Sequence, residues 1–318
     1  MPSIKILITY HDEHKLIKSD ILQPIQTGCA NASKLFNGML RDDDGENISE
    51  HNPKYNELSA QYWAWKNYDK LDNPDYIGFM HYRRHFMFDG WQGNPDLCWL
   101  PKSNMYFVPY ISLEYMKHLS SEYIEKQLEN TDIIVLKPYD VKNLNSKNIR
   151  TQYASLAKQE AKTFDIFIKT AKELYPNYLR SIEKIEKGSV QYLCNMFIMK
   201  KELFFEYSDF CFSILQAVDE KIDSTNMCGA ALRFLGFLGE FCLSIYIFQQ
   251  LKEGKYKIKE LNGSFILSDS SDKNLRFKYF YLLILSKITF GKTRKKYKQE
   301  RKNLKTIIKI NDLNRGNA

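Results

Sequence analysis

The sequence predicts an α/β fold, in which helices flank a mixed β-sheet. Three observations lead to this class. By their apolar patterns, the first ninety residues run strand, loop, helix, strand. Further apolar runs alternate with helical patterns to about residue 250. Apolar residues also make up 44% of the 318-residue chain, which is ample for a sizeable core.

The first elements follow from the spacing of the apolar residues. Residues 4–9 form a short apolar run that predicts a buried strand, and the polar region after it predicts a loop to about residue 53. Over residues 56–71, apolar side chains recur at helical spacing, which predicts a helix. Residues 76–80 form a second apolar run, and we interpret it as another buried strand.

The later elements are predicted in the same way. Ser112 suits the N-cap of a helix over 112–130. The elements after it are a strand over 131–137, a helix over 151–175, an apolar run within 190–200, and helices over 202–219 and 238–251.

The compartment is indicated by three features. The chain has no run of eighteen apolar residues, no visible secretory signal, and six dispersed cysteines without a CxxC pair. We therefore expect a reduced, cytoplasmic protein without a membrane-spanning helix.

Basic charge is concentrated in a C-terminal tail. Residues 273–309 contain thirteen lysines and arginines against one acid, whereas residues 1–272 carry a net charge of −4. We therefore divide the chain into one domain, 1–272, and a tail, 273–318. An apolar stretch joined to a polybasic one is typical of an amphipathic helix on an anionic membrane surface. The alternatives are a helix packed on the body and nucleic-acid contact; we expect the membrane and no nucleic acid.

The strand predicted at 76–80 leads directly into four polar residues, His81, Tyr82, Arg83 and Arg84. In open α/β sheets, ligands bind at the carboxyl ends of the strands. Two guanidinium groups there provide planar, permanently charged donors that suit a diphosphate. The alternative is a surface arginine pair that closes a strand.

Two acidic features are candidates for chemistry. Glu240 stands among phenylalanines and leucines. A carboxyl group in such surroundings has a raised pKa unless it is paired, and a raised pKa suits a general base. A salt bridge to Arg233 or an exposed helix face is the alternative. Asp43 and Asp44 lie in a run of three aspartates before a glycine, which suits either a divalent cation or a polar turn.

Several blocks together resemble a known family. They span about residues 4–250 and are Asp43–Ser49, Asn56–Asn67, Asp75–Phe86, Asn195–Met199 and Phe234–Glu240. The sequences Trp-Ala-Trp-Lys-Asn and His-Tyr-Arg-Arg are their most specific parts. On these motifs the chain resembles the bacterial capsular-polysaccharide and O-antigen glycosyltransferases once catalogued only as a domain of unknown function.

The resemblance implies a GT-A-like nucleotide-sugar transferase with a Rossmann-type sheet. Family members build surface polysaccharides on a lipid-linked acceptor at the inner face of the membrane, and some resemble galactofuranosyl or galactosyl transferases that use a UDP sugar. We therefore expect an inverting hexosyltransferase, peripheral at that face, with a UDP-sugar donor and a lipid-linked glycan acceptor. A non-catalytic carbohydrate- or nucleic-acid-binding protein is the competing class.

The resemblance also implies roles at the donor. Thr9, Tyr10 and His11 would contact the nucleotide, and the group from His81 to Arg84 would hold the diphosphate. GT-A enzymes usually end a central strand with an Asp-x-Asp that binds a metal. Because arginines stand there in this chain, we expect that no divalent ion is required.

Further roles follow from the same resemblance. If manganese or magnesium is needed after all, Asp43 and Asp44 would hold it. Glu240 would act as the general base. Trp63, Asn195 and Met196 would border the sugar or acceptor pocket.

Overall fold

The computed structural model describes residues 2–88, 98–100, 104–108, 110–155, 159–266 and 294–302. The strands are β1 Ile4–Tyr10, β2 Leu22–Gln26, β3 Leu40–Arg41, β4 Tyr76–His81, β5 Arg84–Phe86, β6 Cys98–Leu100, β7 Met105–Val108, β8 Ile133–Leu136, β9 Tyr139–Asp140, β10 Val190–Gln191, β11 Phe197–Lys200, β12 Ile258–Leu261 and β13 Gly263–Ile266. The α-helices are α1 Asn52–Tyr55, α2 Leu58–Lys66, α3 Leu113–Lys117, α4 Ser121–Leu128, α5 Ile149–Ser155, α6 Ala161–Leu174, α7 Leu179–Lys187, α8 Lys201–Asp219 and α9 Phe234–Glu253. Short 3-10 helices cover Cys29–Asn31, Ser49–His51, Tyr68–Leu71, Val141–Leu144 and Pro176–Tyr178.

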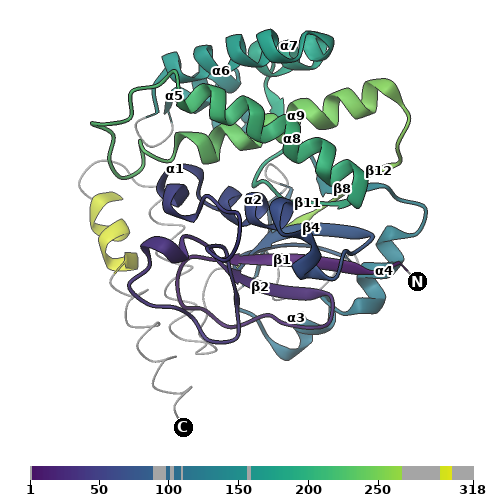
Figure 1. The fold of residues 1–318 in the computed structure, drawn as a ribbon. Helices are drawn as coiled ribbons and strands as arrows, with labels where there is room; N and C mark the ends of the chain where they lie inside the picture. The colour runs from purple at the N-terminus through teal and green to yellow at the C-terminus, as the bar shows by residue number, and fades with distance from the viewer. Residues whose placement is uncertain are drawn as a thin grey trace.

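The central sheet is mixed and mostly parallel. Its main path runs β3-β2-β1-β4-β11-β8-β12, and β11 is antiparallel to both of its neighbours. From the end of β4, the strands β5, β13, β7 and β6 continue as a branch. Helices cover both faces of the sheet (Figure 1). The predicted α/β class, a mixed sheet flanked by helices, is confirmed.

The two faces of the sheet bury alternate residues of each strand. In β1, Ile6 and Ile8 pack in one apolar cluster, which includes residues of α3 and α4. Leu7 packs in the other cluster, with residues of α2, α8 and α9. At the centre of the sheet, β4 and β11 come very close. A Cβ atom at Gly78 would lie 2.7 Å from Ile198 Cγ1, so this position of β4 requires glycine.

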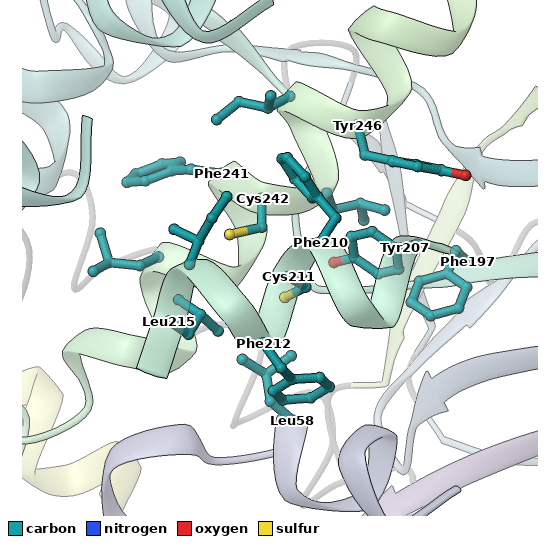
Figure 2. Close-up of a cluster of buried hydrophobic side chains, with 14 of the residues drawn as sticks. Leu58, Phe197, Tyr207, Phe210, Cys211, Phe212, Leu215, Phe241, Cys242 and Tyr246 are labelled. Atoms are coloured by element: carbon teal, nitrogen blue, oxygen red, sulfur yellow. The ribbon is translucent and has the colours of Figure 1, made fainter. Parts of the chain in front are cut away.

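The larger core lies among the helices above the sheet. Figure 2 shows Phe210 from α8 and Phe241 and Tyr246 from α9 in this cluster, with Cys211 and Cys242 between the same two helices. Among the described residues, α9 is the one helix whose length and composition would allow it to cross a membrane. Because 83% of its apolar window is buried inside this molecule, we interpret α9 as a core helix.

The elements differ from the predicted ones in several places. The helix predicted over 56–71 is α-helical only as α2 and ends in a 3-10 helix over Tyr68–Leu71, and α7 was not predicted. The predicted loop before residue 53 contains β2, which pairs in parallel with β1. The helices predicted over 112–130 and 151–175 are each divided in two, as α3 with α4 and α5 with α6. In the first case α3 ends at Lys117, with His118 as its C-cap, and Ser120, whose backbone is extended (ψ 154°), is the N-cap of α4.

The predicted tail, 273–318, lies largely outside the described residues. Within it, residues 294–302 form a helix. The division of the chain at residue 272 and the membrane role of residues 273–309 stay predictions.

Candidate active site

A cavity of about 470 Å³ lies at the carboxyl ends of β1, β2 and β4. Thr9 lies at the end of β1 and pairs with His81 at the end of β4, and Thr27 directly follows β2. The side chains that line it are Thr9, His11, Thr27, Asn52, Asn56, Glu57, His81, Tyr82, Arg83, Arg84, Arg233 and Phe265. This is the sheet edge at which ligands bind in open α/β folds.

Three guanidinium groups reach the cavity from two distant segments. Arg83 and Arg84 lie at the turn between β4 and β5, where His81 pairs with Arg84. Arg84 lies over the Phe265 ring at 5.5 Å. Arg233 comes from the residue before α9, and its Nε donates to Asn56 Oδ1 at 2.7 Å. Among the residues that the structure describes, the cavity wall has one carboxylate, Glu57, against these three cations, so the wall favours an anion.

Tyr82 connects this turn to the loop that follows β1. Its ring stacks on His14 with centroids 4.1 Å apart and meets His11 edge-on at 5.1 Å. The guanidinium of Arg83 lies 5.5 Å from the same ring. The aromatic contacts therefore hold two strand ends together at the mouth of the cavity.

His81 contributes a hydrogen bond rather than a charge. Its Nε2 lies 2.6 Å from the backbone oxygen of Cys194, which can only accept, so Nε2 carries the proton. Nδ1 is then an acceptor and faces Thr9 Oγ1 at 3.2 Å. Burial lowers the pKa of His81 from its ordinary value, and this favours the neutral ring.

Glu240 lies in α9. It is not among the side chains that line the cavity, but it interacts with the charges of Glu57, Arg84 and Arg233, which do line it. Its Oε1 accepts a hydrogen bond from the backbone N–H of Cys194 at 3.0 Å. Burial, and then the neighbouring carboxylate of Glu57, raise the pKa of Glu240 to about 7, while Arg84 and Arg233 act in the opposite direction. A carboxyl group that gains and loses a proton near neutral pH is suited to general-base catalysis.

Three residues predicted for the site are core residues instead. Tyr10 is fully buried, and its hydroxyl donates to Lys15 O and accepts from Ile17 N, each at 3.0 Å. Trp63 is 2% exposed and donates from Nε1 to Asp44 O. Met196 is fully buried in the cluster below the sheet. The predicted contacts of Tyr10 with the nucleotide, and of Trp63 and Met196 with sugar, are therefore corrected.

Asn195 is also buried, yet it contacts the wall of the site. Its Nδ2 donates to Glu57 Oε1 at 2.9 Å and to Gly236 O at 3.1 Å. It therefore orients a residue of the cavity wall but does not itself line the cavity, which corrects its predicted place at the border of the pocket.

Asp43 and Asp44 do not line the cavity. Asp43 forms an ion pair with Arg41 at 2.6 Å, and Asp44 forms one with Lys70 at 2.9 Å. These contacts favour the polar turn over the metal site. Within the described part of the chain, no group of three or more histidines, cysteines or acids is arranged to hold a metal. Independence from divalent metal stays a prediction.

Sequence reasoning missed Glu57, Asn56 and Arg233 as cavity residues. Asn56 and Glu57 open one of the motif blocks, just before the predicted helical pattern becomes apolar. Arg233 directly precedes the apolar stretch of α9. For Glu57 and Arg233, the sequence signal was a charged residue next to the end of an apolar helix.

Comparison with known proteins gives a family and a fold. No curated protein matches the chain. A family model described as a domain of unknown function, DUF4422, matches residues 5–251. The apo structure of the bifunctional glycosyltransferase WbbM is 34% identical, with a TM-score of 0.75 over 83% of this chain and 45% of that one. This chain thus spans less than half of that protein, and the fold matches part of a glycosyltransferase. By the extent of the family match, the chain belongs to the DUF4422 family.

Proposed function

We propose that this chain is a glycosyltransferase that moves a hexose from a UDP sugar to a hydroxyl group of a lipid-linked glycan. The observation that carries the proposal is the cavity itself. Three guanidinium groups line it, and a carboxyl group with a pKa of about 7 lies beside it. The similarity to part of a bifunctional glycosyltransferase supports the same reaction class.

The arginines would bind the diphosphate of the donor. As the sugar leaves, negative charge grows on the diphosphate oxygen that held it, and fixed cations stabilise that charge. Arg83, Arg84 and Arg233 are such cations, so we propose that the reaction does not require a divalent ion. Activity that survives excess chelator would support this, and complete loss restored by manganese would contradict it.

Glu240 would remove the proton from the acceptor. The acceptor oxygen attacks the anomeric carbon while the bond from that carbon to the diphosphate oxygen breaks. The electron pair of this bond leaves with UDP, and the proton of the acceptor hydroxyl moves to the Glu240 carboxylate. Attack on the face opposite the diphosphate would invert the anomeric configuration.

The finer assignment follows from the family resemblance. Galactofuranose or galactose is the donor sugar that we favour, and capsule, O-antigen or exopolysaccharide is the product. We place the enzyme in the cytoplasm, peripheral at the inner face of the membrane. Because the acceptor is held in the bilayer, an enzyme on the same surface meets it at a higher effective concentration.

A donor screen tests the reaction. Several UDP-hexoses, in pyranose and furanose forms, are incubated with the enzyme and a glycan acceptor, and UDP release is followed. Glu240→Gln is expected to bind UDP normally and to lose most transfer, about 100-fold or more. The matched control is Glu220→Gln, an exposed position at the end of α8, which should transfer normally. Normal turnover by Glu240→Gln would refute the assignment of the base.

Ligand-induced stabilisation separates this function from the competing class. A ligand of the folded state raises the melting temperature. The proposal predicts a rise with UDP or a UDP sugar. A melting temperature that RNA raises and UDP sugars leave unchanged would favour a nucleic-acid-binding protein.

Truncation tests the membrane association. Removal of residues 273–318 is expected to release the protein from anionic vesicles, since each basic residue near the bilayer contributes about 1 kcal/mol. Transfer to a soluble acceptor analogue should continue. Neutral vesicles serve as the control, and unchanged binding of the truncated protein to anionic vesicles would contradict the idea.

A further inference from the structure

Cys194 and Asn195 form an unusual backbone turn beside the cavity. Their φ angles are 73° and 49°, so two consecutive residues other than glycine adopt the left-handed conformation. Such a conformation is uncommon for residues with a side chain and persists only where surrounding contacts hold it. The contacts that hold this turn are therefore informative.

Each residue of the turn binds a different glutamate. The N–H of Cys194 donates to Glu240 Oε1 at 3.0 Å. The next residue, Asn195, donates from Nδ2 to Glu57 Oε1 at 2.9 Å. Because Nδ2 also donates to Gly236 O, two acceptors fix the orientation of the amide. One dipeptide thus holds two carboxyl groups from separate helices in adjacent positions.

The helices are shaped to allow this approach. Glu57 directly precedes α2, and Glu240 lies in α9. A Cβ atom at Gly239 would lie 2.6 Å from Leu58 Cδ1 and 3.3 Å from Asn195 Oδ1. The glycine therefore lets the start of α2 and the turn pack against α9.

Charged residues from three parts of the chain surround Glu240. Glu57 precedes α2, Arg84 lies on β5, and Arg233 precedes α9. Two further titratable groups are uncharged near neutral pH. His81 on β4 has a lowered pKa, and burial raises the pKa of the Cys194 thiol to about 12. Glu57 is therefore the negative charge that acts on Glu240, against two arginines.

We propose that Glu57 is a positioning residue whose negative charge, held near Glu240 by the Cys194–Asn195 turn, controls the protonation state of Glu240. The inference rests on the proposed function for its kinetic test, in which Glu240 is the base. Glu57 disfavours a second negative charge beside it. Together with burial, which is the larger cause, this makes Glu240 ionise at a higher pH than an isolated glutamate, and transfer begins at that pH.

The isosteric change Glu57→Gln isolates the charge. The amide oxygen of glutamine can still accept from Asn195, so the turn keeps its hydrogen bond. With the negative charge removed, the ionised form of Glu240 becomes more favourable. The acid limb of the kcat/KM profile should then shift from near pH 7 to lower pH, by about one unit.

The kinetic experiment compares three proteins across pH 5 to 9: the unmodified chain, Glu57→Gln, and Glu50→Gln. Glu50 is exposed, lies outside the cavity wall, and loses the same charge on substitution. The proposal expects a downward shift for Glu57→Gln and none for Glu50→Gln. An unchanged acid limb in Glu57→Gln, or a shift to higher pH, would overturn it.

A second experiment does not depend on turnover. Because the folded state raises the pKa of Glu240 from 4.5 to about 7, this group stabilises the fold below pH 4.5, and that stability is lost as pH rises through 7. We measure the melting temperature as a function of pH. In Glu240→Gln, the fall in melting temperature between pH 4.5 and 7 that comes from this group should be absent. In Glu57→Gln, that fall should end at a lower pH than in the unmodified chain.

The double variant tests whether Glu57 acts through Glu240. If Glu57 acts through Glu240, the profile of Glu57→Gln combined with Glu240→Gln should closely match that of Glu240→Gln alone over this pH range. Glu57 also acts on His81, so a small effect of Glu57→Gln is expected to remain in the double variant. An effect as large as that of Glu57→Gln alone would overturn the proposal. If no donor is turned over, the proposed function fails, and these profiles still decide the coupling between the two glutamates.

Discussion

Replacing Arg84 with methionine removes one of the three guanidinium groups on the cavity wall and keeps an unbranched side chain against the Phe265 ring. A hydrogen bond to a charged partner contributes about 1.5–3 kcal/mol. The dissociation constant of UDP should therefore rise about 10- to 150-fold. Arg84 also lowers the pKa of Glu240, so its loss should move the acid limb of the kcat/KM profile to higher pH.

Isothermal titration with UDP measures the affinity, and a pH series of initial rates measures the limb. Arg180→Met, at an exposed position on α7, is the matched control and should bind UDP normally. The expected pH shift is opposite in sign to that of Glu57→Gln, which separates electrostatic effects from general damage to the fold. UDP affinity within threefold of normal, or a limb that moves to lower pH, would refute the reasoning.

Three stability predictions follow from buried contacts, each measured by chemical denaturation. Asp42→Ala should lower the free energy of unfolding by about 2–6 kcal/mol, because the N–H groups of Gly28 and Cys29 lose their buried acceptor. The control Asp44→Ala removes a surface ion pair and should change the free energy of unfolding by no more than about 0.5 kcal/mol. Trp63→Phe should lower the free energy of unfolding by about 1–3 kcal/mol, because a hydrogen bond and side-chain volume are lost, and should leave UDP affinity unchanged. Weaker UDP binding would indicate that Trp63 does contribute to the binding site. Gly78→Ala should cost about 1–3 kcal/mol by overpacking β4 against β11, and an unchanged midpoint would contradict the close approach.

The strands that are apolar along their length could be predicted from the sequence, and β2 could not. β1, β4 and β8 lie where continuous apolar runs predict them. β2 has the sequence Leu-Gln-Pro-Ile-Gln, and a proline normally argues against a strand. It is tolerated because β3 pairs with β2 only from Ile25 onward, which leaves the edge beside Pro24 without that partner.

Site residues were predictable where they follow a predicted strand or stand alone in an apolar stretch. Arg83 and Arg84 follow β4 directly, so the rule for strand ends placed them. Glu57 and Arg233 come close to them only in the folded chain. Their local signal, a charged residue beside an apolar helix end, does not say which residues they contact. Tyr10 and Trp63 were misplaced because an aromatic side chain suits a core as well as a sugar pocket, and burial by distant elements decides between the two.

The position of β4 has a consequence for how the protein is made. This strand pairs with β1, which is synthesised before it, and with β11, which is synthesised long after it. The outer strand β12 follows later still. A nascent chain that has reached residue 190 therefore carries an open apolar edge at its centre. Because this edge stays unpaired until β11 is synthesised, a chaperone that shields it during synthesis should reduce aggregation.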